Sequence, residues 1–131
     1  MVRFLVCSFA VLLAAQGAPA FGQVTSITVS GQLSGGNFVD AVCSVSKTGQ
    51  ISGTGVLYGV NPSNGYTYKY PFAITKGATT SGKLVLYGTM AAAPSIPVTM
   101  VLSVPSGPMT FTYVVNGQSY VLSGTDTVIA K

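Results

Sequence analysis

The chain of 131 residues contains no histidine, no tryptophan and only two acidic side chains, Asp40 and Asp126. Without histidine, a Ser-His-Asp triad is impossible, and general acid–base catalysis lacks its most frequent group. A zinc site requires three or four Cys, His or carboxylate ligands, and past residue 20 only Cys43 joins the two aspartates. These absences predict a protein that is not an enzyme and that uses neither a metal nor a cofactor.

Asp40 and Asp126 leave one route open to a hydrolase. A glycosidase that works with two carboxylates needs both groups to face each other across a cleft. No pattern in the sequence brings these two residues together. We expect each aspartate instead to be solvated or salt-bridged, with Asp126 near Lys47 or Lys131.

Arginine is absent after residue 20, where the basic residues are five scattered lysines: Lys47, Lys69, Lys76, Lys83 and Lys131. Against two aspartates, these five lysines leave this part of the chain with a net charge of +3. Nucleic-acid-binding proteins concentrate Lys and Arg on one face and use arginine to read bases. The sequence therefore predicts no nucleic-acid partner.

Long hydrophobic runs are absent except at the start of the chain. Arg3 is followed by the apolar run 4–15 and then by Ala18-Pro19-Ala20, an order typical of a secretory signal peptide. A membrane span needs about 20 apolar residues, more than this run provides. We expect residues 1–20 to form an apolar signal helix, cleaved after Ala20 or Gly22, and the protein to be secreted or periplasmic.

Cysteine is nearly absent from the exported part, since Cys43 stands alone there and an intramolecular disulfide is impossible. A single cysteine in an exported protein either pairs with another chain or packs as a small hydrophobe. Val42 and Val45 lie beside it, which favours a buried free thiol over the intermolecular alternative.

Residues 21–131 read as one all-β domain. Apolar and polar residues alternate with period two between clusters of Gly, Asn, Ser and Pro, and no helical periodicity interrupts them. Asn116-Gly117 indicates a type I′ hairpin turn, and the segments 76–81 and 105–108 also read as turns. The eight expected strands are 24–33, 38–46, 50–60, 66–75, 82–91, 96–104, 109–115 and 118–129.

Eight strands joined by short turns predict an antiparallel meander that forms a closed or nearly closed barrel, because closure removes exposed edges. A two-sheet β-sandwich is the alternative. Pro71 lies within an expected strand, which predicts an edge or a bulge there. Strand glycines predict bends and close backbone approach in a tight barrel, namely Gly53, Gly55, Gly88 and Gly124.

An aromatic row is the most distinctive motif, with Tyr66, Tyr68, Tyr70 and Phe72 on one face of the expected fourth strand. Rings with a polar tip favour the binding of apolar or sugar-like ligands, although a half-buried strand also places apolar residues at every second position. If the barrel holds a ligand, this row would line its cavity. Further hydroxyls would come from Tyr58, Tyr87 or Tyr113.

The function predicted from these features is that of an exported, non-enzymatic β-barrel that binds a small apolar or sugar-like ligand or a cell-surface component. Two alternatives stay open. An eight-stranded outer-membrane barrel fits the strand lengths and the low charge, but such a barrel has long external loops and every turn here is short. A structural or adhesive extracellular protein fits the low charge and the abundance of Ser, Thr and Gly.

Overall fold

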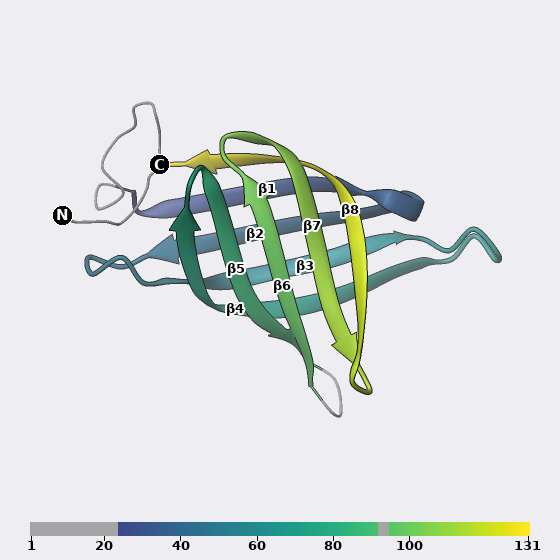
Figure 1. Cartoon of the computed structure of the whole chain (residues 1–131). Helices are drawn as coiled ribbons and strands as arrows, with labels where there is room; N and C mark the ends of the chain where they lie inside the picture. The colour runs from purple at the N-terminus through teal and green to yellow at the C-terminus, as the bar shows by residue number, and fades with distance from the viewer. Residues whose placement is uncertain (1–23, 92–94) are drawn as a thin grey trace.

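The computed structural model describes residues 24–91 and 95–131, which form eight antiparallel strands (Figure 1). Each strand pairs with the next along the chain, and β8 pairs with β1, so the sheet closes into a barrel. The expected meander barrel is therefore confirmed over the two-sheet sandwich. The expected signal segment 1–20 and its cleavage sites lie outside the described residues.

The strands follow the expected order along the chain. The segment between β1 and β2 is a short 3-10 turn, η2 (Ser34–Gly36). The strands are β1 (Ser26–Leu33), β2 (Asn37–Val45), β3 (Ile51–Val60), β4 (Thr67–Thr80), β5 (Lys83–Met90), β6 (Ile96–Ser103), β7 (Ser106–Val115) and β8 (Gln118–Ala130). Most ends agree with the predicted ranges to within two residues. Asn116 and Gly117 both have positive φ, as the predicted type I′ turn requires.

The predicted turn at 76–81 is wrong, because β4 continues to Thr80 and only Ser81 and Gly82 form the reversal. A β-bulge between Ile74 and Lys76 shifts the register against β5 and lets the strand carry on. After the bulge Gly77 faces the interior, where Ile51 and Leu86 leave no room for a side chain. Residues 76–80 resemble a turn because they are small and polar, but they form a strand that packs against larger side chains.

The predicted turn at 105–108 is also wrong in part, because β7 begins at Ser106. Ser106, Gly107 and Pro108 pair with Thr127, Asp126 and Thr125 of β8. They have no partner in β6, whose ladder with β7 covers only Val98–Val101 and Thr110–Tyr113. The start of β7 therefore has one neighbour, which makes a proline tolerable there.

Pro71 occupies a local edge, as the sequence predicts. It pairs with Val56 of β3, but the first pair between β4 and β5 is Phe72 with Met90. The bulge follows a few residues later, after Ile74. A closed barrel can therefore hold a proline within a long strand where the neighbouring strand has already ended.

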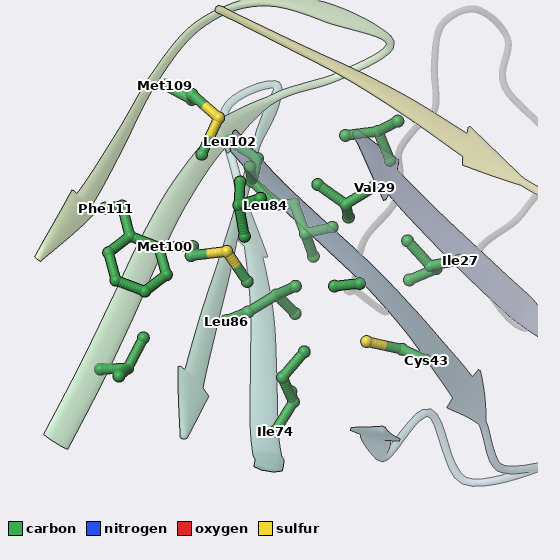
Figure 2. Close-up of a cluster of buried hydrophobic side chains, with 14 of the residues drawn as sticks. Ile27, Val29, Cys43, Ile74, Leu84, Leu86, Met100, Leu102, Met109 and Phe111 are labelled. Carbon is green, nitrogen blue, oxygen red and sulfur yellow. The ribbon is translucent and has the colours of Figure 1, made fainter. Parts of the chain in front are cut away.

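Side chains from all eight strands fill the middle of the barrel. Figure 2 shows part of this core, in which Ile27 and Val29 of β1 face Leu84 and Leu86 of β5 and Met100 of β6. Gly31 lies against Met109 so closely that a Cβ atom would clash with the sulfur atom. Large side chains thus occupy the space that glycine leaves, as close packing of a small barrel requires.

The strand glycines confirm the predicted close approach of backbones. At Gly53, Gly88 and Gly124, a Cβ atom would lie within 2.1 Å of a carbonyl oxygen of the neighbouring strand. Gly124 meets the carbonyl of Gln32 in this way, at the seam where β8 joins β1. The seam can close only because this position carries no side chain.

The two ends of the barrel differ. At one end, the backbone N–H of Ser26 donates to the carbonyl of Lys131, and the turns after β2, β4 and β6 lie nearby. At the other end, β3–β4 and β7–β8 extend as hairpins past their neighbours, because Thr67–Pro71 have no partner in β5 and Gln118–Ser123 have none in β1. Figure 1 shows the β3–β4 turn far to the right and the β7–β8 turn at the lower edge.

Gly124→Ala tests the role of the seam. A methyl group at this position overlaps the Gln32 carbonyl, so β1 and β8 must separate locally. We expect the free energy of unfolding in urea to fall by about 2 kcal/mol or more. The neighbouring exposed change Ser123→Ala is the control and should stay within about 0.5 kcal/mol of the parent. Equal stability of the two variants would show that the seam accommodates a side chain.

Candidate functional site

A contact between two aromatic rings closes the packed core on the side of the β3–β4 and β7–β8 turns. Phe72 of β4 and Phe111 of β7 meet across the interior with ring centroids 5.5 Å apart in an edge-to-face arrangement. Both are buried. Beyond them the inner faces of the two hairpins continue toward solvent, so this pair forms the floor of an open end.

Tyr68 and Tyr70 form one wall above that floor. They follow Phe72 at two-residue steps on the same face of β4, and their rings lie 5.4 Å apart. Tyr68 lies over Gly59, where a side chain would clash with it, and its hydroxyl donates to Asn37 Oδ1. Asn37 in turn donates from Nδ2 to the Ser34 carbonyl. Tyr68 is thereby fixed in place, while Tyr70 beside it is 51% exposed.

Tyr113 and Tyr120 form the second wall. They are direct partners across the β7–β8 ladder, and their rings stack at 5.3 Å with an interplanar angle of 19°. Tyr113 also touches Phe111 of the floor, at 6.3 Å between centroids. Tyr120 is 41% exposed. We call the six residues Tyr68, Tyr70, Phe72, Phe111, Tyr113 and Tyr120 the aromatic mouth.

The aromatic mouth is uncharged. The other inward positions of the two hairpins are Leu57, Gly59, Val115, Gln118 and Leu122. Within the described residues, the hydroxyls of Tyr70, Tyr113 and Tyr120 have no hydrogen-bond partner, which leaves them available to a bound molecule. The site therefore offers flat apolar rings and neutral hydroxyls.

The predicted site residues divide between the mouth and the surface. Tyr68, Tyr70, Phe72 and Tyr113 face the interior end of the barrel, as described above. Tyr66 lies in the turn before β4 and is exposed. Tyr58 and Tyr87 point outward from the wall and do not reach the interior, so their hydroxyls are not those of the mouth.

Each of the two outward tyrosines has a partner on the outer wall. The Tyr58 hydroxyl donates to Asp40 Oδ2 at 2.9 Å, and its ring stacks on Phe38. Its pKa is raised, because ionisation would lose this bond and place two negative charges together. Lys76 Nζ lies 5.3 Å from the centre of the Tyr87 ring. Both pairs are surface contacts.

Sequence reasoning missed Phe111 and Tyr120 as members of the mouth. A signal for Tyr120 was present, because the two-residue turn at Asn116-Gly117 pairs Val115 with Gln118 and hence Tyr113 with Tyr120. Phe111 has no comparable local signal. Its contact with Phe72 joins strands far apart in the chain and depends on the closed topology.

Cys43 is buried inside the barrel, as predicted, and it is a free thiol. Burial raises the pKa of this thiol to about 11, because the apolar core disfavours the thiolate. A thiol that is buried and protonated is a poor nucleophile. The alternative of pairing with another chain does not fit this placement.

Asp126 is placed against expectation. It is only 5% exposed and faces the interior, far from the predicted contacts with Lys47 or Lys131. Oδ2 accepts a 2.8 Å hydrogen bond from the Ser103 N–H, while Oδ1 has no partner within the described residues. The sequence contained a signal for this inward position, since Asp126 alternates with Gly124 and the core residue Val128 on one face of β8.

Ser103 links Asp126 to the rest of a small polar network. Its hydroxyl donates to the Pro108 carbonyl at 2.6 Å and accepts a 2.9 Å bond from Lys83 Nζ. These bonds lie where β6 and the start of β7 have no ladder between them. The network therefore joins the two strands through side chains in place of backbone pairing.

Asp40 and Asp126 do not meet. Asp40 pairs with Ser30 and faces outward, whereas Asp126 pairs with the adjacent Gly31 and faces inward. Side chains of successive residues in a strand point to opposite faces, so the barrel wall separates the two carboxylates. The geometry of a two-carboxylate hydrolase is absent from the described residues.

The outer wall is rich in hydroxyl groups. Thr28, Thr54 and Thr112 occupy outward positions, and Val42 lies between Thr28 and Thr54. Val85 and Val101 are outward-facing partners elsewhere on the wall. No continuous apolar belt surrounds the barrel over residues 24–91 and 95–131. In the same part of the chain, no helix has the length and apolar character needed to cross a bilayer.

Comparison of the chain with protein-family models, with curated protein sequences and with solved structures finds no match.

Asp126→Asn tests the buried carboxyl group. Desolvation raises the pKa of Asp126 from 3.8 to about 6, against the opposing effects of the Ser103 N–H and Lys83. The folded state thus binds the proton more tightly than the unfolded state, so the stabilisation is complete below about pH 4 and is lost as the pH rises through 6. We expect the free energy of unfolding to fall by about 2 kcal/mol between pH 4 and pH 7.5.

Asparagine keeps the bond to Ser103 and cannot ionise, so the variant should lose most of this pH dependence and be the more stable protein at pH 7.5. Urea denaturation at several pH values measures both quantities. Other groups contribute little to the pH dependence of stability in this range, because the chain has no histidine and only one other carboxyl side chain. A pH profile equal to that of the parent would mean that Asp126 is not the titrating group.

Proposed function

We propose that this protein is an exported, non-enzymatic binding protein whose aromatic mouth takes a neutral ligand with a flat apolar face, above all a saccharide. The observation that carries this proposal is the pair of exposed tyrosines, Tyr70 and Tyr120, on the inner faces of two hairpins that stand above a closed core. A side chain needed only for packing would be buried with Phe72. Half-exposed tyrosine rings that pack against neighbouring rings are instead typical of recognition surfaces.

The chemistry of the mouth favours sugars over other small molecules. A pyranose ring presents a face of C–H groups that stacks on aromatic rings, with hydroxyls around its edge. Tyrosine supplies both an apolar face and a hydrogen-bonding tip. The absence of charge on the inward positions of the two hairpins disfavours acidic and basic ligands, because these would lose hydration without an ionic partner.

The ligand is expected at the open end and not in the middle of the barrel, where side chains from all eight strands already pack together. This differs from the expected cavity lined by the whole tyrosine row. Tyr68 and Tyr70 keep their place in the site, Phe72 becomes its floor, and Tyr120 is added. An eight-stranded barrel is of the size that side chains can fill, which is consistent with this placement.

The alternatives fit these observations less well. An outer-membrane barrel needs an apolar outer band and a polar interior, the reverse of the Thr-rich wall and apolar core described here. A purely structural protein accounts for the filled core but not for the exposed tyrosines. A hydrolase would need Asp40 and Asp126 on the same side of the wall.

Export is tested by the mass of the protein that leaves the cytoplasm of a bacterial host expressing the full chain. We expect a mature form that begins at Phe21 or Gln23. The change Ala20→Leu with Ala18→Leu should block processing, because signal peptidase requires small side chains at these positions. Recovery of the full-length chain in the cytoplasm alone would contradict the proposed export.

Ligand binding is tested with a panel of neutral oligosaccharides of glucose, galactose, mannose and N-acetylglucosamine, by titration calorimetry. Tyr70→Ala and Tyr120→Ala should each weaken the binding of any sugar that the parent binds by about tenfold, the loss expected for one stacking contact. Tyr87→Ala is the matched control, since Tyr87 is 39% exposed but lies on the outer wall.

The control should bind as the parent does. Equal losses in all three variants would show that binding does not involve the mouth, and no binding to any member of the panel would overturn the saccharide proposal.

A further inference from the structure

The stagger of the barrel leaves several strand segments with a neighbour on one side only. Thr67–Pro71 of β4 pair with β3 but not with β5, and Ser106–Met109 of β7 pair with β8 but not with β6. Gln118–Ser123 of β8 pair with β7 but not with β1, whose last pair with β8 is Leu33 with Gly124. Such open edges are templates for pairing with another chain.

The one-sided segments of β4 and of the start of β7 carry features that prevent pairing. Lys69 and Pro71 interrupt the first, and Pro108 interrupts the second. The remainder of β4, past Ile74, contains the bulge and Lys76. Charges, prolines and bulges are the usual means by which proteins protect edge strands.

The β8 segment Gln118–Ser123 has none of these features. It contains no charge, no proline and no bulge, and its ladder with β7 is regular. Tyr120 and Val121 are strongly exposed, at 41% and 58%. Alternating exposed residues of high β-propensity on an open edge favour association.

The hydrogen-bonding groups of this edge follow from the hairpin. In a two-residue turn, the flanking residues Val115 and Gln118 form a hydrogen-bonded pair, and such pairs alternate along an antiparallel ladder. Gln118, Tyr120 and Leu122 therefore direct their N–H and C=O groups toward β7. Ser119, Val121 and Ser123 direct theirs toward the open side.

We propose that two copies of this chain associate through this edge, with β8 pairing antiparallel to β8 of the second copy about a two-fold axis at Val121. In this register Val121 lies opposite Val121 of the other copy, and Ser119 lies opposite its Ser123. Every outward-directed N–H and C=O group of Ser119, Val121 and Ser123 then meets its complement. A closed two-fold contact of this kind gives a dimer and not a fibre.

The side chains are compatible with the same register. Tyr120 lies opposite Leu122 of the other copy on the inner face, an aromatic–aliphatic pair, and the two Val121 side chains meet on the outer face. The segment is uncharged, so two copies approach without like-charge repulsion. The proposal does not depend on a sugar ligand, because the edge exists whether or not the mouth is occupied.

The first test compares two matched lysine variants by sedimentation velocity over a range of protein concentrations. Val121→Lys places two like charges opposite each other at the proposed axis. Val42→Lys makes the same change at an equally exposed valine, 59% against 58%, in a strand paired on both sides. The parent and V42K should form a dimer whose share rises with concentration, and V121K should stay monomeric.

A second pair of variants tests the register. Val121→Pro removes an N–H group that faces the open side, so the monomer should fold, but the two central hydrogen bonds of the dimer are lost. The association constant should fall by about 30-fold. Val121→Cys should form a covalent dimer with oxidised glutathione as the electron acceptor, because facing Cα atoms in such a pair lie about 5.5 Å apart.

Val42→Cys is the control for the cross-link and keeps the same native cysteine, Cys43, as V121C. A monomeric parent at all concentrations would overturn the proposal. So would a dimer that V121K and V121P leave unchanged, since this would place the interface elsewhere. Loss of saccharide binding in Y70A has no bearing on these outcomes, because Tyr70 lies on β4, outside the β8 edge.

Discussion

Closure of eight strands into a ring forces them to be staggered, and the stagger governs the rest of this molecule. The pleat of each strand points every second residue into the interior, and the stagger decides how deep each of these residues lies. The stagger also leaves β3–β4 and β7–β8 longer than the strands beside them, which raises two hairpins above the end of the core. The aromatic mouth, the polar network at Ser103 and the open edge of β8 all lie where one strand continues and its neighbour has stopped.

Much of the fold could be predicted from the sequence, because period-two alternation and turn residues are local signals. The alternation predicted the eight strands in their observed order, and Asn116-Gly117 predicted the register of the last hairpin. The extension of β4 past Ile74 was not predicted, since Lys76, Gly77 and the threonines that follow resemble a polar turn. Only the packing of Ile51 and Leu86 over Gly77 explains why this segment stays in the sheet.

The candidate site was predictable in part for the same reason. The alternation placed Tyr68, Tyr70 and Phe72 on a common face, but the depth of each residue along the barrel depends on where neighbouring strands end. The depth of a residue is therefore a property of the closed sheet and not of the local sequence. It separates Phe72, which is buried, from Tyr70, which is half-exposed, although the two differ little in local sequence. For Asp126 the local sequence did contain the answer, because its alternation with Gly124 and Val128 indicates an inward position. The prediction of a solvated or salt-bridged aspartate followed instead the general rule that carboxylates avoid the core.

The hydrogen bond between the Ser26 N–H and the Lys131 carbonyl determines where the two ends of the β domain lie. It places the two ends of the described β domain side by side, at the end of the barrel that lies opposite the tyrosines. A tether, a fusion partner or a solid support joined to Lys131 would hold the barrel upright with its aromatic rings pointing away from the point of attachment. Attachment at this end would therefore leave the aromatic mouth accessible to solvent.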